Sequence, residues 1–450
     1  MTAPTAPRRA AYEVLRRVFE DGAWADRALP AVLEHQRVQA AERGLAQRLA
    51  YGAVQRRGTS DHLIASFAGR PLVKLDPPLL AALRLGLYEL LYSETPLHAS
   101  VDQAVELAKS SAGGRRGAGL VNAVLRRAAA EGDGLLGALS DGDPASAAIR
   151  HSYPPWLAEL WWRELGREGA LAVMGAGNEP AETALRVNEL RAGRDQVLAE
   201  LADGGVEAKK APGPPPLDAR ESLVVSGALG DAGMATLAGG RAVDQSRASA
   251  AAVALLDPQP GERVLDLCAG PGLKTTQIAA RMANRGEIVS VELRPQRARQ
   301  VAELAERFGA EIVRAAEADA ASDDLGSGYD RVLVDPPCSD LGTLASRPDA
   351  RWRKRPEDPA RLAELQGAIL ERGAAALAPG GTLVYSTCTI SARENEQVAA
   401  RALEAAGLRA DPLGVRFSEL ASARDPRFLQ TRPDRDCTDG FFLARLRRAE

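Results

Sequence analysis

The segment from Arg263 to Thr276 reads as a strand, a glycine turn and the start of a helix. A short apolar run, Val264–Leu267, leads directly into Gly270 and Gly272. This order opens α/β nucleotide-binding units, because glycines let the backbone approach a ligand and a helix N-terminus offers free N–H groups. Ordinary βα turns also carry glycine, so the segment alone predicts an α/β unit and leaves its ligand open.

Two common phosphate-binding motifs do not match this turn. A Walker loop needs a glycine where Leu267 stands and a lysine where Leu273 stands. A dinucleotide fingerprint needs a third glycine, and Thr275 occupies that place. The remaining expectation is a nucleoside cofactor such as S-adenosylmethionine, with an acid after the next strand to bind its ribose.

Composition limits location and metal chemistry. No apolar run approaches the roughly 18 residues of a membrane span, and the first residues lack an apolar signal core. We therefore expect a cytoplasmic protein with no membrane partner. Four cysteines stand far apart without a Cys-x-x-Cys pair, which predicts neither a zinc site nor disulfides.

Three domains are predicted along the chain. Residues 8–132 show helical periodicity, and residues 1–133 hold 18 Lys and Arg against 14 Asp and Glu, so we expect an all-α RNA-binding domain there. Residues 132–144 are rich in Gly, Asp and Ser and predict a linker. Residues 145–238 predict a small α+β module that positions RNA, and residues 239–450 predict an α/β domain.

The two later domains are predicted from short apolar runs. The expected strands of the module are 184–188, 206–210 and 222–226, with a helix at 195–202. The expected strands of the α/β domain are 264–267, 288–292, 311–314, 331–334, 382–386 and 440–446, with helices at 295–308 and 359–377.

Acidic residues follow successive predicted strands of the α/β domain. Glu292 ends the second strand about 20 residues past the glycine turn, where a ribose-binding acid is expected. Asp319 follows the third strand and could meet the adenine edge, and Asp335 follows the fourth. Such sheets bind ligands at the carboxyl ends of their strands, which favours a functional interpretation over solvated acids.

Two thiols stand at neighbouring strand ends. Cys338 belongs to Asp-Pro-Pro-Cys after strand 331–334, and Cys388 follows strand 382–386. A thiol is a soft nucleophile suited to adding to carbon 6 of a pyrimidine ring, which makes carbon 5 nucleophilic. Asp335 could stabilise the adduct near ring nitrogen 3, and a second thiol could assist removal of the carbon-5 proton. Spacing leaves open which thiol attacks.

Three motifs together resemble the RNA cytosine-C5 methyltransferase family: Asp266-Leu-Cys-Ala-Gly-Pro-Gly-Leu-Lys-Thr, Asp335-Pro-Pro-Cys-Ser, and Tyr385-Ser-Thr-Cys-Thr with Glu394-Asn-Glu. The helical region is similar to NusB-like domains through Leu83-Arg-Leu-Gly-Leu-Tyr-Glu-Leu-Leu and Leu120-Val-Asn-Ala-Val-Leu-Arg. This combination is typical of the bacterial Fmu/Sun type. The resemblance implies a Rossmann-like catalytic domain, S-adenosylmethionine as cofactor and one cytosine of 16S ribosomal RNA as the target.

The resemblance also implies roles for single residues. Cys388 would be the nucleophile, Cys338 the thiol that assists release, and Asp335 would face the base. The implied cofactor contacts are Cys268, Ala269, Gly270, Pro271, Gly272, Leu273, Lys274, Glu292, Asp319 and Asp335. Gly270 and Leu273 replace an alanine and a glycine of the usual turn, and Glu292 replaces an aspartate. The Leu273 side chain could crowd the methionine end of the cofactor.

A cationic loop around Trp352 follows the Cys338 motif. Its position predicts RNA-backbone contacts with base stacking rather than a solvated loop. The predicted RNA-binding residues are Arg347, Arg351, Trp352, Arg353, Lys354 and Arg355. A target cytosine must leave any helical stack before carbon 6 can be attacked, so we expect base flipping or a looped substrate.

Two other functions stay open at this stage. A transfer-RNA cytosine methyltransferase could use the same catalytic domain, although the NusB-like region favours ribosomal RNA. An RNA-binding assembly factor without turnover could keep the fold, although both thiols and Asp335 are present. We expect a monomer that acts on free RNA or on an assembling small subunit.

Overall fold

The computed structural model of the protein describes residues 3–110 and 114–449. The chain forms two compact units. Unit 1 contains the residues up to Pro180 together with the segment Leu344–Lys354, and unit 2 contains Ala181–Thr343 and Arg355–Glu450. Among the helices of the described ranges, none is long and apolar enough to cross a membrane.

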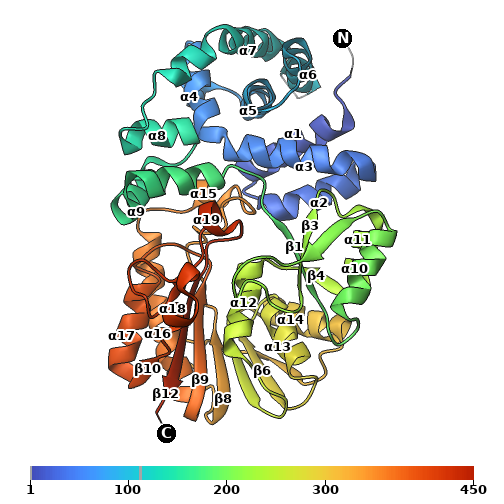
Figure 1. Ribbon diagram of the computed structural model, residues 1–450. Helices are drawn as coiled ribbons and strands as arrows, with labels where there is room; N and C mark the ends of the chain where they lie inside the picture. Colours follow the sequence, from blue (N-terminus) through green and yellow to red (C-terminus); the bar gives the residue numbers. More distant parts are fainter. Residues whose placement is uncertain (1–2, 111–113, 450) are drawn as a thin grey trace. The chain divides into compact units, whose positions relative to one another are not determined.

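Unit 1 is helical (Figure 1). Its helices are α1 (Ala6–Phe19), α2 (Ala25–His35), α3 (Ala40–Gln55), α4 (Arg57–Phe67), α5 (Pro77–Tyr92), α6 (Leu97–Ser110), α7 (Gly114–Gly137), α8 (Pro144–His151), α9 (Pro155–Ala176) and the short α15 (Ala350–Arg353), with a 3-10 turn at Leu72–Lys74. Helix α5 is apolar on most sides and is buried from Ala81 to Glu89, as expected of the central helix of a bundle. The buried Glu89 carboxylate is neutralised by Arg8 at 2.6 Å.

The predicted linker 132–144 is partly wrong. Helix α7 continues through its first half to Gly137, and α8 begins at Pro144. Leu135 and Leu136 pack against the apolar core of unit 1, and this tertiary contact outweighs the low helix propensity of the glycines around them. Residues 138–143 therefore form the whole connection.

Unit 2 begins with a four-stranded antiparallel sheet. Its strands are β1 (Thr183–Val187), β2 (Glu207–Lys210), β3 (Ser222–Ser226) and β4 (Ala242–Asp244), in the order β2-β3-β1-β4, with helices α10 (Arg194–Asp203) and α11 (Gly230–Ala238). The three strands and the helix predicted for the module are present. Strand β4 was not predicted, because three residues are too short to show periodicity.

The rest of unit 2 is a mixed eight-stranded sheet in the order β10-β12-β9-β8-β5-β6-β7, with β11 paired to β12. Its strands are β5 (Arg263–Leu267), β6 (Glu287–Glu292), β7 (Val313–Glu317), β8 (Tyr329–Val334), β9 (Leu377–Thr387), β10 (Leu408–Ala410), β11 (Leu429–Gln430) and β12 (Phe442–Arg448). Neighbours from β7 to β9 are parallel, and β12 runs antiparallel to β9.

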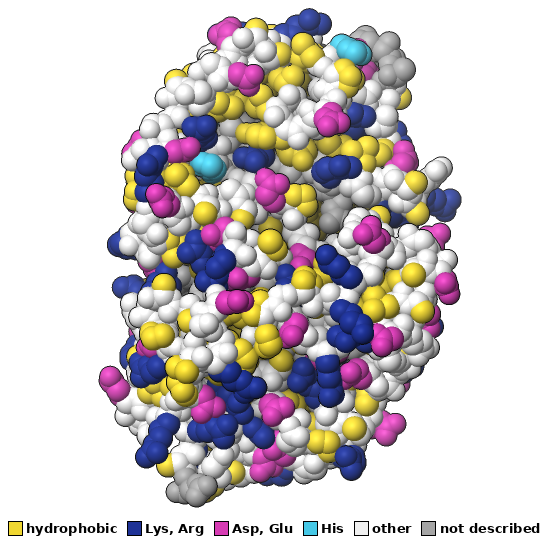
Figure 2. All heavy atoms as spheres, in the orientation of Figure 1, with side chains coloured by type: hydrophobic (Ala, Val, Ile, Leu, Met, Phe, Trp, Pro, Cys, Tyr) yellow, Lys and Arg dark blue, Asp and Glu magenta, His cyan; other side chains and the backbone are white. Residues whose placement is uncertain are grey.

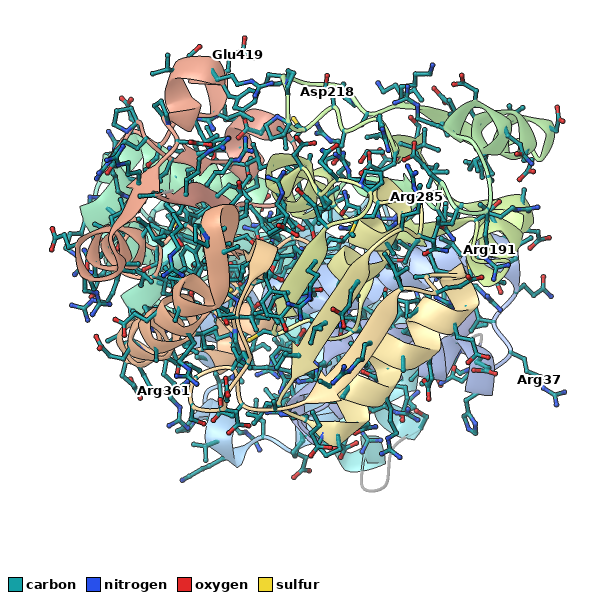
Figure 3. The ribbon with its side chains drawn as sticks, turned by 90° about the horizontal axis from the view of Figure 1, so that it is seen from below. Arg37, Arg191, Asp218, Arg285, Arg361 and Glu419 are labelled. Atoms are coloured by element: carbon teal, nitrogen blue, oxygen red, sulfur yellow. The ribbon has the colours of Figure 1, made fainter. Side chains whose placement is uncertain are left out.

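Helices cover both faces of this sheet (Figure 1). Helices α12 (Arg247–Leu256), α13 (Leu273–Arg281) and α14 (Pro295–Phe308) pack on one face, and α16 (Asp358–Ala376) and α17 (Glu396–Ala406) on the other. Short helical segments at Leu413–Arg416 (α18), Ser418–Leu420 and Pro433–Asp436 (α19) precede β12. Figure 3 shows Arg361 of α16 and Glu419 pointing away from the ribbon, whereas Ile369 and Leu370 of α16 are buried in the core.

The parallel register brings the predicted site residues to one edge of the sheet. Leu267 of β5 is paired with Val334 of β8, and Val334 is paired with Tyr385 of β9. Residues at the ends of these strands are therefore neighbours. They are the glycine turn after β5, Asp335 after β8, and Ser386 with the residues after it at the end of β9.

Candidate active site

The two thiols predicted from neighbouring strand ends lie in contact. Cys338 Sγ and Cys388 Sγ are 3.1 Å apart. Cys338 follows β8 and Cys388 follows β9, which pair directly in the sheet. Cys338 is buried and Cys388 is partly exposed. This leaves Cys388 as the more accessible sulfur.

Side chains next to each cysteine hold the pair together. Ser339 Oγ and Thr389 Oγ1 are hydrogen-bonded at 2.9 Å, which joins the two loops one residue beyond the thiols. The buried Glu394 carboxylate accepts from the Ser339 backbone N–H at 2.8 Å and from the Ser339 hydroxyl. Gln366 of α16 donates to the same carboxylate at 3.1 Å. Because every member of this network is buried, it fixes the separation of the loops.

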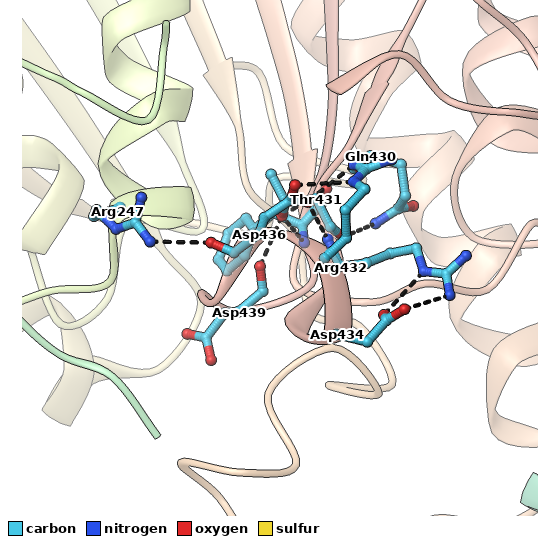
Figure 4. Close-up of polar contacts among 9 residues, drawn as sticks. Arg247, Gln430, Thr431, Arg432, Asp434, Asp436 and Asp439 are labelled. Carbon is cyan, nitrogen blue, oxygen red and sulfur yellow. Dashed lines mark hydrogen bonds and ion pairs between the residues drawn. The ribbon is translucent and has the colours of Figure 1, made fainter. Parts of the chain in front are cut away.

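The backbone adds a second connection. Gly342 N–H donates to the Cys388 carbonyl at 3.0 Å, and Gly440 N–H donates to the Gly342 carbonyl at 2.8 Å. A Cβ on Gly342 would lie 1.9 Å from the Gly440 carbonyl oxygen, so only glycine fits there. The segment before Gly440 is anchored by Arg247, which donates to the Asp436 carbonyl at 3.0 Å (Figure 4).

The Asp335 carboxylate has a donor on each oxygen. Lys274 Nζ lies 2.7 Å from Oδ2, and Ser386 Oγ donates to Oδ1 at 2.7 Å. Lys274 comes from the N-terminus of α13 and Ser386 from the end of β9, so two elements hold one carboxylate. A carboxylate with a cation and a hydroxyl as partners is held rigidly at the edge of the site.

A further carboxylate, which the sequence analysis did not single out, lies against the thiols. Asp340 Oδ1 lies 3.1 Å from Cys388 Sγ and 3.9 Å from Cys338 Sγ. Asp340 has a left-handed backbone with φ of 59°, which aspartate tolerates better than most residues. The Thr343 hydroxyl and N–H both donate to its carbonyl, at 3.0 and 3.1 Å, and this holds the turn.

The glycine turn after β5 is closed by Glu292 and Arg297. Glu292 Oε2 accepts from the Gly270 N–H at 3.0 Å, and Arg297 donates to the Gly270 carbonyl at 2.6 Å. A Cβ on Gly270 would lie 2.5 Å from Glu292 Oε2, so the longer glutamate occupies the room that an alanine side chain would need. The two departures at 270 and 292 therefore compensate each other.

The sequence and the structure of this chain match known proteins over its whole length. Family models match residues 253–447 as 16S rRNA methyltransferase RsmB/F, residues 5–130 as the NusB family, and residues 153–216 as the ferredoxin-like domain of RsmF/B-like methyltransferases. A Bacillus subtilis protein named "Probable ribosomal RNA small subunit methyltransferase B" is 35% identical over 99% of both chains. The chain belongs to the RsmB/F family of 16S rRNA methyltransferases.

Further relatives and solved structures agree with this assignment. A Pseudomonas putida protein named "Ribosomal RNA small subunit methyltransferase B" is 33% identical over 98% of both chains. The crystal structure of PH0851 covers 99% of both chains with a TM-score of 0.82 and 26% identity. A methyltransferase homologue from Pyrococcus horikoshii covers 68% of this chain and 98% of its own, with a TM-score of 0.59 and 28% identity.

These matches confirm the predicted fold class and cofactor. The RsmB/F chain has a NusB-like helical domain, a small α+β module and a Rossmann-like methyltransferase domain, and its cofactor is S-adenosylmethionine. The division at residues 132, 145 and 239 stays a prediction.

The residues around the glycine turn fit this cofactor. Asp266 Oδ1 is buried without a hydrogen-bond partner, which is the state expected of an acceptor kept for a ligand. Glu292 is buried at the end of β6, beside the turn. Asp319 Oδ1 accepts from the Ala321 N–H at 2.9 Å, so this side chain also closes its own turn. The cofactor contacts from Cys268 to Lys274 stay predictions, as do those of Glu292, Asp319 and Asp335.

The backbone of Leu273 is held by a side chain of the small antiparallel sheet. Its carbonyl accepts a hydrogen bond from the fully buried Arg186 of β1 at 3.2 Å, and Arg186 also donates to Thr276 at 2.8 Å. Burial lowers the pKa of Arg186 to about 10, so the side chain stays protonated at neutral pH. The small antiparallel sheet thus fixes the first turn of α13 from outside.

Asp266 predicts a pH dependence of stability. Burial raises its pKa from 3.8 to about 7, and the Thr275 hydroxyl at 2.5 Å opposes this shift. Between these two values the folded chain holds a proton that the unfolded chain has lost, so unfolding free energy falls as pH rises, by roughly 4 kcal/mol in all. Above about pH 7 both states are ionised and this contribution stops changing.

Urea unfolding at pH values from 5 to 8 measures this effect. We expect Asp266→Asn to flatten the decline of the urea midpoint, because an amide does not titrate. The exposed Asp324 is the matched control, and Asp324→Asn should keep the wild-type slope. Equal slopes in wild type and Asp266→Asn would contradict the prediction.

Three residues of the predicted RNA-binding loop are part of the packing of unit 1. Arg351 is fully buried, and its guanidinium donates to Gly177 O at 2.6 Å and to Asn178 Oδ1 at 2.7 Å. The guanidinium of Arg351 is therefore engaged inside unit 1, and its RNA contact stays a prediction that this packing does not favour. Trp352 Nε1 donates to Val54 O at 2.7 Å, and Arg353 pairs with Asp349 at 2.6 Å. The aromatic ring is used for packing, which argues against its predicted stacking on a base.

The other three residues of that loop stay predicted RNA contacts. Arg347 and Arg355 are exposed and Lys354 is partly exposed. Several arginines of the helical unit have acidic partners instead, in the pairs Arg8–Glu89, Arg16–Glu20, Arg17–Glu13, Arg57–Asp61 and Arg127–Glu131. Figure 2 shows Lys and Arg interspersed with Asp and Glu over the visible face.

The packing role of Arg351 gives a second prediction. Arg351→Ala leaves the Ser152 and Leu344 carbonyls without their Arg351 donor and leaves the Gly177 carbonyl only the long 3.5 Å hydrogen bond from Gln55, which should destabilise the protein by roughly 3 kcal/mol or more. Arg355→Ala, at an exposed position, is the control and should change stability by less than about 0.5 kcal/mol. Thermal unfolding measures both, and an unchanged midpoint for Arg351→Ala would contradict the assignment.

Proposed function

We propose that this chain methylates carbon 5 of a cytosine in 16S ribosomal RNA through a covalent bond between Cys388 and carbon 6 of the ring. The contact between Cys338 Sγ and Cys388 Sγ, at the ends of adjacent strands of a methyltransferase domain, carries the proposal. The full-length relatives named ribosomal RNA small subunit methyltransferase B support the choice of RNA.

Cytosine needs activation because carbon 5 is a weak nucleophile. Attack of Cys388 Sγ on carbon 6 moves the electron pair of the carbon 5–carbon 6 bond into an enamine, whose carbon 5 is nucleophilic. Asp340 Oδ1, 3.1 Å from this sulfur, can accept the thiol proton during attack. S-adenosylmethionine supplies an electrophilic methyl group.

Asp335 is proposed to stabilise the adduct at ring nitrogen 3. Charge moves toward that nitrogen when the sulfur adds, and a proton or hydrogen bond there lowers the barrier. The ammonium of Lys274, 2.7 Å from Asp335, holds the carboxyl in place. Ser386 keeps the other oxygen in place.

Release needs a base for the carbon-5 proton. We assign this proton to the sulfur of Cys338. The electron pair of the carbon 5–hydrogen bond then restores the carbon 5–carbon 6 double bond, and the carbon–sulfur bond breaks with its electron pair returning to Cys388. The two sulfurs are 3.1 Å apart, so one substrate ring can meet both. The target cytosine must leave its helical stack to reach the two sulfurs. We propose that one copy of the chain acts in the cytoplasm on free RNA or on an assembling small subunit.

A tritium-release assay tests the position of methylation. 16S RNA transcribed with tritium on carbon 5 of cytosine should release one tritium per methyl group transferred. Methyl transfer without tritium release would contradict carbon 5 as the target. Preferential methylation of transfer RNA would contradict the ribosomal target, and failure to bind S-adenosylmethionine in calorimetry would favour the assembly factor.

A further inference from the structure

We propose that Cys338, Cys388 and Asp340 form a binding site for one divalent cation of the zinc class. Their donor atoms form a closed triangle. The two sulfurs are 3.1 Å apart, and Asp340 Oδ1 lies 3.1 Å from Cys388 Sγ and 3.9 Å from Cys338 Sγ. All three atoms lie within 4.8 Å of one another.

These separations are close to those of a tetrahedral site. Zinc bonds of about 2.3 Å to sulfur and about 2.0 Å to carboxylate oxygen place neighbouring donors roughly 3.5–3.8 Å apart. The two sulfur–oxygen edges therefore have to change by only about 0.4 Å, and the sulfur–sulfur edge has to lengthen by about 0.7 Å. Three protein donors leave the fourth position open to water, as in zinc sites of the open type.

The donors are held in place by contacts that do not involve the metal. The Ser339–Thr389 hydrogen bond and the Gly342–Cys388 backbone bond join the two cysteine loops. The turn from Asp340 to Thr343 directs the carboxylate to the thiols. Binding thus orders little of the chain, which favours affinity because preorganised groups lose little entropy.

The donor set selects the kind of cation. Two thiolates favour zinc or cadmium over magnesium or calcium, which prefer oxygen donors. Binding deprotonates both thiols, so affinity should rise with pH. The sequence does not show this site, because the cysteines are 50 residues apart and lack the usual short spacing.

A bound cation would take Cys388 out of catalysis. Its sulfur electron pair would be held in the metal bond, so it could not add to a cytosine ring. This consequence rests on the proposed function, whereas the site itself does not. Removal of the cation by a chelator would free the Cys388 sulfur again, so the bound cation would be a reversible inhibitor of methylation.

Cadmium titration of the metal-free full-length protein, without RNA or cofactor, tests the site. The thiolate-to-cadmium absorption band in the ultraviolet should saturate at one equivalent and vanish when EDTA is added. Asp340→Ala should weaken binding at least about tenfold, and Cys338→Ser/Cys388→Ser should abolish the one-equivalent band. The exposed thiol of Cys437 gives the control, and Cys437→Ser should titrate like wild type.

The measurements distinguish a failure of the metal site from a failure of the proposed methylation reaction. Circular dichroism and S-adenosylmethionine calorimetry confirm that the variants fold. A band that survives in the double cysteine variant, or Asp340→Ala binding as tightly as wild type, would overturn the three-donor site. Tritium release by the metal-free wild type is measured in parallel, so a protein that methylates cytosine without binding cadmium contradicts the metal site alone.

Discussion

Cys388→Ala is expected to lower methylation of 16S RNA by at least about 10³-fold, since it removes the attacking sulfur and leaves the ring unactivated. Cys338→Ala should behave differently. Attack and methyl transfer still occur in this variant, but the carbon-5 proton has lost its acceptor, so the RNA stays bound to Cys388. A denaturing gel of Cys338→Ala with RNA and S-adenosylmethionine should show a slow-migrating protein–RNA adduct.

The other cysteines provide controls for this experiment. Burial raises the pKa of the Cys268 thiol, and the carboxylates of Glu292, Asp335 and Asp266 raise it further. Cys268 is therefore protonated at neutral pH and unsuited to attack. Cys437→Ser, added to Cys338→Ala, should leave the adduct unchanged, whereas Cys388→Ala in that background should abolish it. An adduct that survives the loss of Cys388 would mean that another group attacks.

Local sequence patterns predicted the catalytic domain well. Helix α14 has the predicted bounds, Pro295–Phe308, because a proline at its start and Gly309 after its end delimit an amphipathic run. Strand β7 lies two to three residues later than predicted, and β9 begins five residues earlier, at Leu377. Apolar periodicity marks the buried centre of a strand, whereas its ends depend on pairing with neighbours.

Long-range packing escaped the sequence analysis. The cationic loop was predicted from its charge and from its position after Cys338, yet Leu344–Lys354 belongs to unit 1. Arg351 satisfies carbonyls of Ser152 and Gly177, which lie more than 170 residues earlier in the chain. No local pattern distinguishes such a buried arginine from one that binds phosphate.

The candidate site could be predicted only in part, because some of its contacts follow from strand order and others from long-range packing. Parallel strands bring their carboxyl ends to one edge, so the proximity of Cys338, Cys388 and Asp335 could be predicted from topology. Asp340 and Glu394 could not be assigned in this way, because their contacts depend on the path of a turn and on a buried network. An acid two residues after a strand-end cysteine is the signal that could have indicated Asp340.

Asp335→Asn is expected to reduce both adduct formation and methylation by about 10²–10⁴-fold, the usual size of an acid–base contribution. Asparagine keeps the shape of the side chain but cannot pass a proton to ring nitrogen 3. It also leaves the ammonium of Lys274, whose side chain is only 12% exposed, without its counter-charge. We measure single-turnover methylation, and we measure the rate of adduct formation in a Cys338→Ala background.

A double-mutant cycle of Lys274 and Asp335 tests whether their salt bridge acts as one unit. If Lys274 and Asp335 act as one unit, Lys274→Met/Asp335→Asn should be no slower than Asp335→Asn alone, because the second substitution removes a partner that has already lost its function. Asp324→Asn, at an exposed carboxylate outside the site, is the matched control and should form the adduct at nearly the wild-type rate. Adduct formation within tenfold of wild type in Asp335→Asn would remove Asp335 from the chemistry, and additive losses in the double variant would mean that Lys274 acts on a different step.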